Sequence, residues 1–161
     1  MKTNTQQDNY TDKAELIDVI NRTPVSELPA ELEPIFDVNN FLKHLAVETL
    51  TGHWDGYSFN KNNFYLYRNT TTRRFEFIPY DTDNTFGIDW FNIDWTTRNV
   101  GSWASSQARP LTKNILAVEV YRKHYYLYLK QLINEAFTVN TIQSKTLAIR
   151  SKIENYATTD P

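Results

Sequence analysis

DVNNFLKHLAVETLTGHWDGYSFN, residues 37–60, is the stretch that decides the fold, because it changes from a helical pattern to a polar loop. Asp37 is a typical N-cap and Gly52 a typical C-terminal stop. Apolar residues recur at helical spacing at Phe41, Leu42, Leu45, Ala46 and Thr49 or Leu50. The residues between them fall mostly on other faces of the helix: Lys43, His44, Val47 and Glu48. The stretch predicts a helix that ends where a loop begins at His53.

The rest of the chain predicts short mixed elements. Asp12-x-x-Glu15 is typical of a capping box and predicts a helix that stops before Pro24. Pro24, Pro29 and Pro34 predict turns with one helical turn among them. The remaining predictions are β-rich runs over residues 63–67 and 74–78, a long, partly ordered loop over 89–110, and helices over 111–137 and 141–156. The fold class is therefore α+β, mainly helical with one β-hairpin.

Composition limits the classes of function. The 161 residues suit one domain or one lobe, and 40% hydrophobic with 14% aromatic residues predict a folded chain. The net charge of −2 has no long run of either sign, which argues against a nucleic-acid partner. The absence of cysteine excludes disulfides and thiolate metal sites. We expect no membrane span and no signal peptide, and we divide the chain into a disordered or added tail over residues 1–11 and a folded lobe over 12–158.

The loop that begins at His53, after the helix predicted between Asp37 and Gly52, carries a catalytic sequence motif. His53, Asp55 and Asn60 reproduce the spacing H-x-D-x-x-x-x-N, in which the Asp accepts a hydroxyl proton and the Asn holds a metal. We interpret Asp55 as a candidate catalytic base, and Asn60 as a metal and cofactor ligand with Asn62 and Asn63 as competitors. His53 is grouped with the cofactor-binding residues because it can orient this loop. The alternative for Asp55 is a turn residue beside Gly56.

A second acidic loop follows the predicted hairpin in FIPYDTDNTFG, residues 77–87. Asp81 and Asp83 are two residues apart, so in an extended segment both carboxylates point to one side. Like charges about 4 Å apart repel by roughly 4 kcal/mol at an effective dielectric near 20, and a divalent cation removes this cost. We therefore interpret both as candidate ligands for Mg²⁺ or Mn²⁺. An Asx-type turn is the alternative.

These segments, with NNFYLY at residues 62–67, resemble the CotH family, the kinase-like proteins named after spore coat protein H. The resemblance runs from about Asp37 to Tyr126. It implies an atypical protein-kinase-like C-lobe that uses ATP and a divalent cation to phosphorylate Ser or Thr on a partner protein. By position Asp81 resembles the metal-binding Asp of kinases. The family also suggests a spore coat or cell-surface location, which the residues themselves leave unknown.

Departures from ordinary kinases limit the resemblance. Trp54 replaces the Arg of H-R-D and Tyr57 stands where many kinases carry a Lys. The chain has four Gly and no G-x-G-x-x-G, so we expect the nucleotide-clamping lobe to be absent from it. Arg68, Arg98 or Arg109 would then neutralise phosphate charge. Two alternatives remain, a pseudokinase-like binding module of a coat or surface assembly, and a metal-dependent hydrolase or nucleotidyl transferase.

Overall fold

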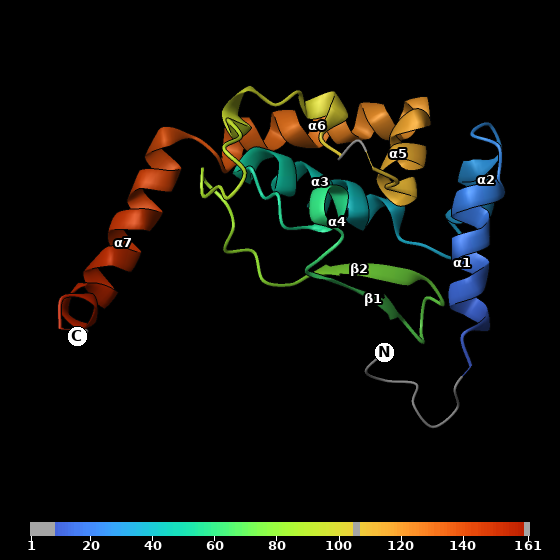
Figure 1. Ribbon diagram of the computed structural model, residues 1–161, viewed down its shortest axis with the longest axis horizontal. Coiled ribbons are helices and arrows are strands. Elements are labelled where there is room, and N and C mark those ends of the chain that lie inside the picture. The colour runs from blue at the N-terminus through green and yellow to red at the C-terminus, as the bar shows by residue number, and fades with distance from the viewer. Residues whose placement is uncertain (1–8, 105–106, 160–161) are drawn as a thin grey trace.

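A computed structural model of the chain describes residues 9–104 and 107–159. Most of the predicted tail, residues 1–8, lies outside this part. The order of elements (Figure 1) is α1 Thr11–Arg22, α2 Leu28–Leu32, α3 Val38–Thr51, α4 Tyr57–Asn60, β1 Phe64–Arg68, β2 Phe75–Pro79, 3-10 turns η1 Trp95–Thr97 and η2 Val100–Ser102, α5 Pro110–Ala117, α6 Glu119–Glu135 and α7 Val139–Ala157. This mixed, mainly helical order confirms the α+β class.

Helix α3 follows its sequence signals closely. The Asp37 carboxylate accepts a hydrogen bond from the backbone N–H of Asn40, and Gly52 ends the helix in the left-handed region at φ 68°. The predicted apolar face is buried, as expected. The prediction is wrong for Glu48, which lies off the apolar stripe and yet is only 2% exposed. Neighbouring elements cover it, a burial that helical periodicity does not report.

The hairpin is fixed to the start of α3. Strands β1 and β2 pair antiparallel with Leu66 opposite Phe77, one residue later along the chain than the predicted runs. Phe75 and Phe77 are buried. The backbone N–H of Asp37 donates to the carbonyl of Phe75, and the side chain of Asn40 donates to the carbonyl of Phe77. The N-terminal end of α3 therefore sets the position of β2, beside which Figure 1 shows α4.

Two predicted helix boundaries are wrong. Helix α1 begins at Thr11, whose backbone N–H and hydroxyl both donate to the side-chain oxygen of Asn9. Asp12 therefore lies inside the first turn and is not the cap. The single helix predicted over residues 111–137 is divided at Val118, which is extended and buried. The guanidinium of Arg122 donates to the carbonyls of Leu116 and Ala117, which stabilises the end of α5.

Buried tryptophans order the described part of the predicted loop, residues 89–104 and 107–110. Trp95 and Trp103 are 6% and 1% exposed, with ring centroids 5.7 Å apart. Their packing explains why this polar stretch adopts the two 3-10 turns η1 and η2. Buried aromatic area thus replaces regular backbone hydrogen bonding as the source of order.

Helix α7 lies outside the core. Figure 1 shows it projecting from the end of α6, on the side of the molecule opposite α1. Its cap is Thr138, which accepts a hydrogen bond from the backbone N–H of Thr141, and none of its residues is buried. Among the described residues, no helix combines the length and apolar character that crossing a membrane requires.

Candidate active site

The loop after α3 is held by buried residues on both sides of Asp55. The backbone N–H of His53 donates to the carbonyl of Glu48, and the indole of Trp54 donates to the carbonyl of Ile88 at 2.8 Å. His53 and Trp54 are 2% and 1% exposed. Asp55 itself is only partly buried. The loop is therefore anchored in the core while its carboxylate remains accessible.

Four asparagine side chains surround the Asp55 carboxylate. Oδ1 accepts from the amide of Asn60 at 2.5 Å and from that of Asn62 at 3.5 Å. Oδ2 accepts from the amides of Asn63 at 2.8 Å and Asn84 at 3.4 Å. Neutral amide donors stabilise an ionised carboxylate and fix its orientation without a counter-charge. Asp55 is therefore more than a turn residue beside Gly56.

Asn84 joins the two acidic loops. Its side chain reaches Asp55, and its carbonyl lies 3.2 Å from Nδ1 of the buried His53. Because a carbonyl can only accept, Nδ1 of His53 is the donor of this bond. Phe86 completes the connection, since its backbone N–H donates to the carbonyl of Thr51 at 2.7 Å. Residues 51–55 and 84–86 thus form one unit, and the burial of His53 favours a role in holding it.

Asp81 and Asp83 are exposed and lie in the segment that leads to Asn84. Asp81 is three residues from Asn84, a chain span of at most about 11 Å. It occupies the left-handed region at φ 50°, which non-glycine residues rarely adopt and which is found at functional sites. Within the described residues, neither carboxylate takes part in a side-chain hydrogen bond or an ion pair. The Asx-type turn predicted as the alternative has no side-chain bond to support it.

The oxygen-bearing side chains of the two loops are of a type that suits a hard cation with phosphate and water as its further ligands. Asp81, Asp83 and the amide of Asn60 carry oxygen donors of the kind that Mg²⁺ and Mn²⁺ prefer. Residues 9–104 and 107–159 contain no group of three or more His, Cys, Asp or Glu side chains placed to hold a metal. A cation here would therefore need phosphate and water oxygens to complete its shell, as Mg²⁺ usually has.

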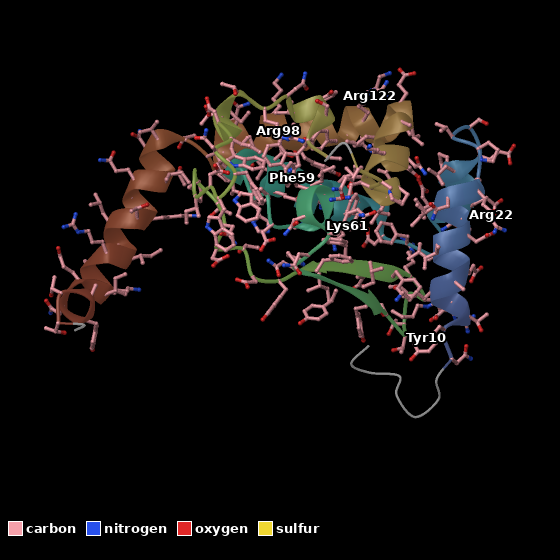
Figure 2. All side chains as sticks on the ribbon, in the orientation of Figure 1. Tyr10, Arg22, Phe59, Lys61, Arg98 and Arg122 are labelled. Carbon is pink, nitrogen blue, oxygen red and sulfur yellow. The ribbon has the colours of Figure 1, made fainter. Side chains whose placement is uncertain are left out.

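Two of the arginines proposed for phosphate binding donate hydrogen bonds to backbone carbonyls within the fold. Arg98 donates to the carbonyls of Trp103 and Ala104, and Figure 2 shows it beside Phe59, over whose ring its guanidinium lies at 5.0 Å. Arg109 is 2% exposed and donates to the carbonyl of Phe59. Burial lowers the pKa of both side chains. Arg98 packs against the rings of Trp95 and Trp103, and Arg109 holds the carbonyl of Phe59 in α4, so both guanidiniums have structural contacts.

The third arginine is also placed by packing. Arg68 ends β1, where its guanidinium lies 5.4 Å from the centre of the Phe75 ring. The exposed cation next to the motif is Lys61, which directly follows Asn60 and is labelled in Figure 2. Its left-handed backbone, with φ 59°, ends α4. Sequence reasoning did not single out Lys61.

Asn84 and Glu48 are the other residues that sequence reasoning missed. Asn84 stood in a good turn sequence, and the only signal for it was its place directly after Asp83. Glu48 is buried behind the Asp55 loop, although its helical position predicted an outward side chain. Neither role can be read from local pattern, because each depends on a contact with a distant element.

Comparison with known proteins gives a consistent result. The family model for CotH kinase protein matches residues 1–161. The chain is 30% identical to inner spore coat protein H of Bacillus subtilis over 161 residues, which cover 99% of the chain and 42% of that protein. Invasins CotH2 and CotH3 of Rhizopus delemar are 28% and 25% identical over 127 residues, or 76% of the chain and 21% of each invasin. The chain thus spans less than half the length of the relatives it matches.

Proposed function

Because this chain belongs to the CotH kinase protein family, we propose that it forms the catalytic lobe of an atypical protein Ser/Thr kinase. The observation that carries the proposal is the Asp55 carboxylate, oriented by four asparagine amides and joined through Asn84 to the loop that bears Asp81. A fixed carboxylate beside a loop of exposed oxygen ligands is the arrangement that phosphoryl transfer requires.

Asp55 is the base in this proposal. It takes the proton of a Ser or Thr hydroxyl as the hydroxyl oxygen bonds to the γ-phosphorus of ATP. The bond from that phosphorus to the bridging oxygen breaks, and ADP leaves with the bond's electrons. The Asn60 and Asn63 amides hold the two carboxylate oxygens, which fixes the direction in which Asp55 can accept the proton.

Asp81, Asp83 and Asn60 would hold the divalent cation. The Asn60 amide nitrogen donates to Asp55, which leaves its carbonyl oxygen available as a ligand. When bound, Mg²⁺ or Mn²⁺ neutralises the charge of the phosphates during transfer. Asp81 is the stronger candidate of the two carboxylates because of its strained backbone at φ 50°.

The acceptor is proposed from the relatives. They are a spore coat protein and two invasins, so we propose a Ser- or Thr-containing protein of a coat or cell-surface assembly, and a location in such an assembly. The relatives are more than twice as long as this chain, and the test accordingly uses the full-length protein.

The test follows the label from ATP. Full-length protein is incubated with Mg²⁺ or Mn²⁺, a Ser-rich acceptor, and ATP labelled at either the γ- or the α-phosphate. We expect γ-label on Ser or Thr and a loss of at least about 100-fold in Asp55→Asn. The exposed Glu15→Gln is the matched control and should keep full activity.

The other outcomes identify the alternatives. Incorporated α-label indicates a nucleotidyl transferase, and release of free phosphate without labelled acceptor indicates a hydrolase. Metal-independent binding of a partner without any transfer indicates a pseudokinase-like module. Transfer that is undiminished in Asp55→Asn would remove Asp55 from the role of base.

A further inference from the structure

Gly56 directly follows Asp55. A neighbouring side chain, and not the backbone conformation, restricts this position to glycine. Its φ of −86° and ψ of −176° are extended values that any residue adopts. A Cβ at this position would lie 3.0 Å from Cδ and Oε2 of Glu48 and 3.2 Å from Oε1. The Glu48 carboxylate therefore occupies the space in which a larger residue would place its first side-chain atom.

Glu48 is an unusual side chain to find in this place. Its side chain is 1% exposed, and its Oε2 lies 3.0 Å from Nε2 of His44. Its Oε1 is buried and, among the described residues, has no hydrogen-bond partner. Burying a carboxylate with an unsatisfied oxygen destabilises a fold, which is a reason to look for a role beyond packing.

Glu48 and His44 contact the Asp55 loop and the strand that precedes the second acidic loop. The carbonyl of Glu48 accepts from the backbone N–H of His53, and its carboxylate touches Gly56, so Glu48 contacts the Asp55 loop on both sides of Asp55. The ring of His44 lies 4.8 Å from that of Phe77 in β2, the strand that leads to Asp81. One turn of α3 thus contacts both the Asp55 loop and β2.

We infer that Glu48 is a positioning residue, whose buried carboxylate sets the place of the Gly56 backbone and through it that of Asp55. The inference rests on the proposed role of Asp55 as the base. The shape of the side chain carries the effect, because the carboxylate is buried against Gly56 and closed off from solvent. A catalytic group must be held within about 0.5 Å of its productive position, and a shift of a few tenths of an ångström at Gly56 takes up much of that margin at Asp55.

The test is a double-mutant cycle in the full-length protein with Gly56→Ala, Glu48→Ala and the two combined. We expect Gly56→Ala to lower kcat roughly 10-fold with little change in the KM for ATP, since the new Cβ displaces the loop and not the nucleotide. The double variant should recover part of this loss, because removing the carboxylate makes room for the Cβ. Glu48→Gln, which keeps the shape and can still accept from His44, should retain most of kcat.

Two results would overturn the inference. One is a double variant whose kcat loss equals the product of the two single losses, which would mean that the residues act independently. The other is a Glu48→Gln variant as impaired as Glu48→Ala, which would assign the effect to charge. Unfolding of each variant is followed in urea, so that a loss of folded protein is not mistaken for a loss of kcat.

A readout without activity separates this inference from the proposed function. Side-chain amide NMR signals of Asn60 and Asn63 report the position of Asp55, to which both donate. They should shift in Gly56→Ala and return toward their original positions in the double variant. Unchanged signals in Gly56→Ala refute the positioning role. Restored signals in a protein that transfers no phosphate would support the positioning role while the proposed kinase function fails.

Discussion

The side-chain amide of Asn84 donates to the carboxylate of Asp55 at 3.4 Å, although the two residues are 29 positions apart. This bond and the contact of the Asn84 carbonyl with His53 join the loop after α3 to the loop after β2. In the proposed kinase function, this meeting of distant segments would bring the base toward the metal ligands. We therefore expect the Asn84 side chain to matter for stability as well as for activity.

Asn84→Asp should destabilise the protein by about 1 to 3 kcal/mol, because it replaces a donor to Asp55 with a second carboxylate at the same distance. Urea unfolding measures the change. Asn134→Asp, on the exposed surface of α6, is the control and should stay within about 0.5 kcal/mol of the parent. Equal stability of the two variants would show that Asn84 does not contact an ionised Asp55.

Asp81→Asn should weaken Mn²⁺ binding in the presence of ATP more than Asp83→Asn does. Of these two aspartates, Asp81 is the one with positive φ, and residues in this backbone region are often found at functional sites. Paramagnetic relaxation of water in a Mn²⁺ titration of the full-length protein measures the affinity. If Asp83→Asn has the larger effect, the metal ligand is Asp83 and the strain at Asp81 has another cause.

Gly52→Ala should lower the free energy of unfolding by about 1 to 2 kcal/mol, since Gly52 ends α3 at φ 68°. The new Cβ would lie 3.6 Å from that of Trp95, an ordinary contact, so backbone strain is the whole cost. Gly52→Asn tolerates the left-handed region better and should lose less. Thermal unfolding compares the two, and identical losses would argue against strain.

Leu129→Ala should cost about 2 to 5 kcal/mol, because Leu129 is 6% exposed in the face of α6 that belongs to the core. Leu147→Ala is the matched change on α7, where the side chain is 56% exposed, and should cost less than about 0.5 kcal/mol. Urea unfolding of both variants gives the difference. A large loss in Leu147→Ala would mean that α7 packs against the core in solution.

Stability should decline between about pH 10 and pH 12, partly through Tyr125. Burial raises the pKa of Tyr125 to about 12, so the unfolded chain loses this proton near pH 10 while the folded chain keeps it. The free energy of unfolding then falls with rising pH by about 1.4 kcal/mol per pH unit for this group. Tyr125→Phe removes this contribution to the slope, while losing the hydroxyl bonds to Thr49 and Val100 lowers stability at every pH. An unchanged slope would contradict the raised pKa.

Local chemistry was sufficient for several elements of the fold. Asp37 and Gly52 mark the ends of α3 because a side-chain oxygen caps the first turn and a glycine adopts the left-handed region at the last. Asn69 accepts from the backbone N–H groups of Thr71 and Thr72, which forms the turn between the strands. The motif spacing placed Asp55 and Asn60 in one candidate site, although it did not predict the hydrogen bond that joins the two side chains.

Tertiary contacts decided the rest. The helix predicted over residues 111–137 is broken because Val118 is buried and Arg122 satisfies the carbonyls exposed by the break. The pattern along the chain could name candidate oxygen ligands, but it could not bring Asn84 to Asp55 or place Glu48 behind Gly56. Periodicity reports which face of an element is apolar, whereas a site depends on distances between elements far apart in sequence, which only the packing of the whole chain sets.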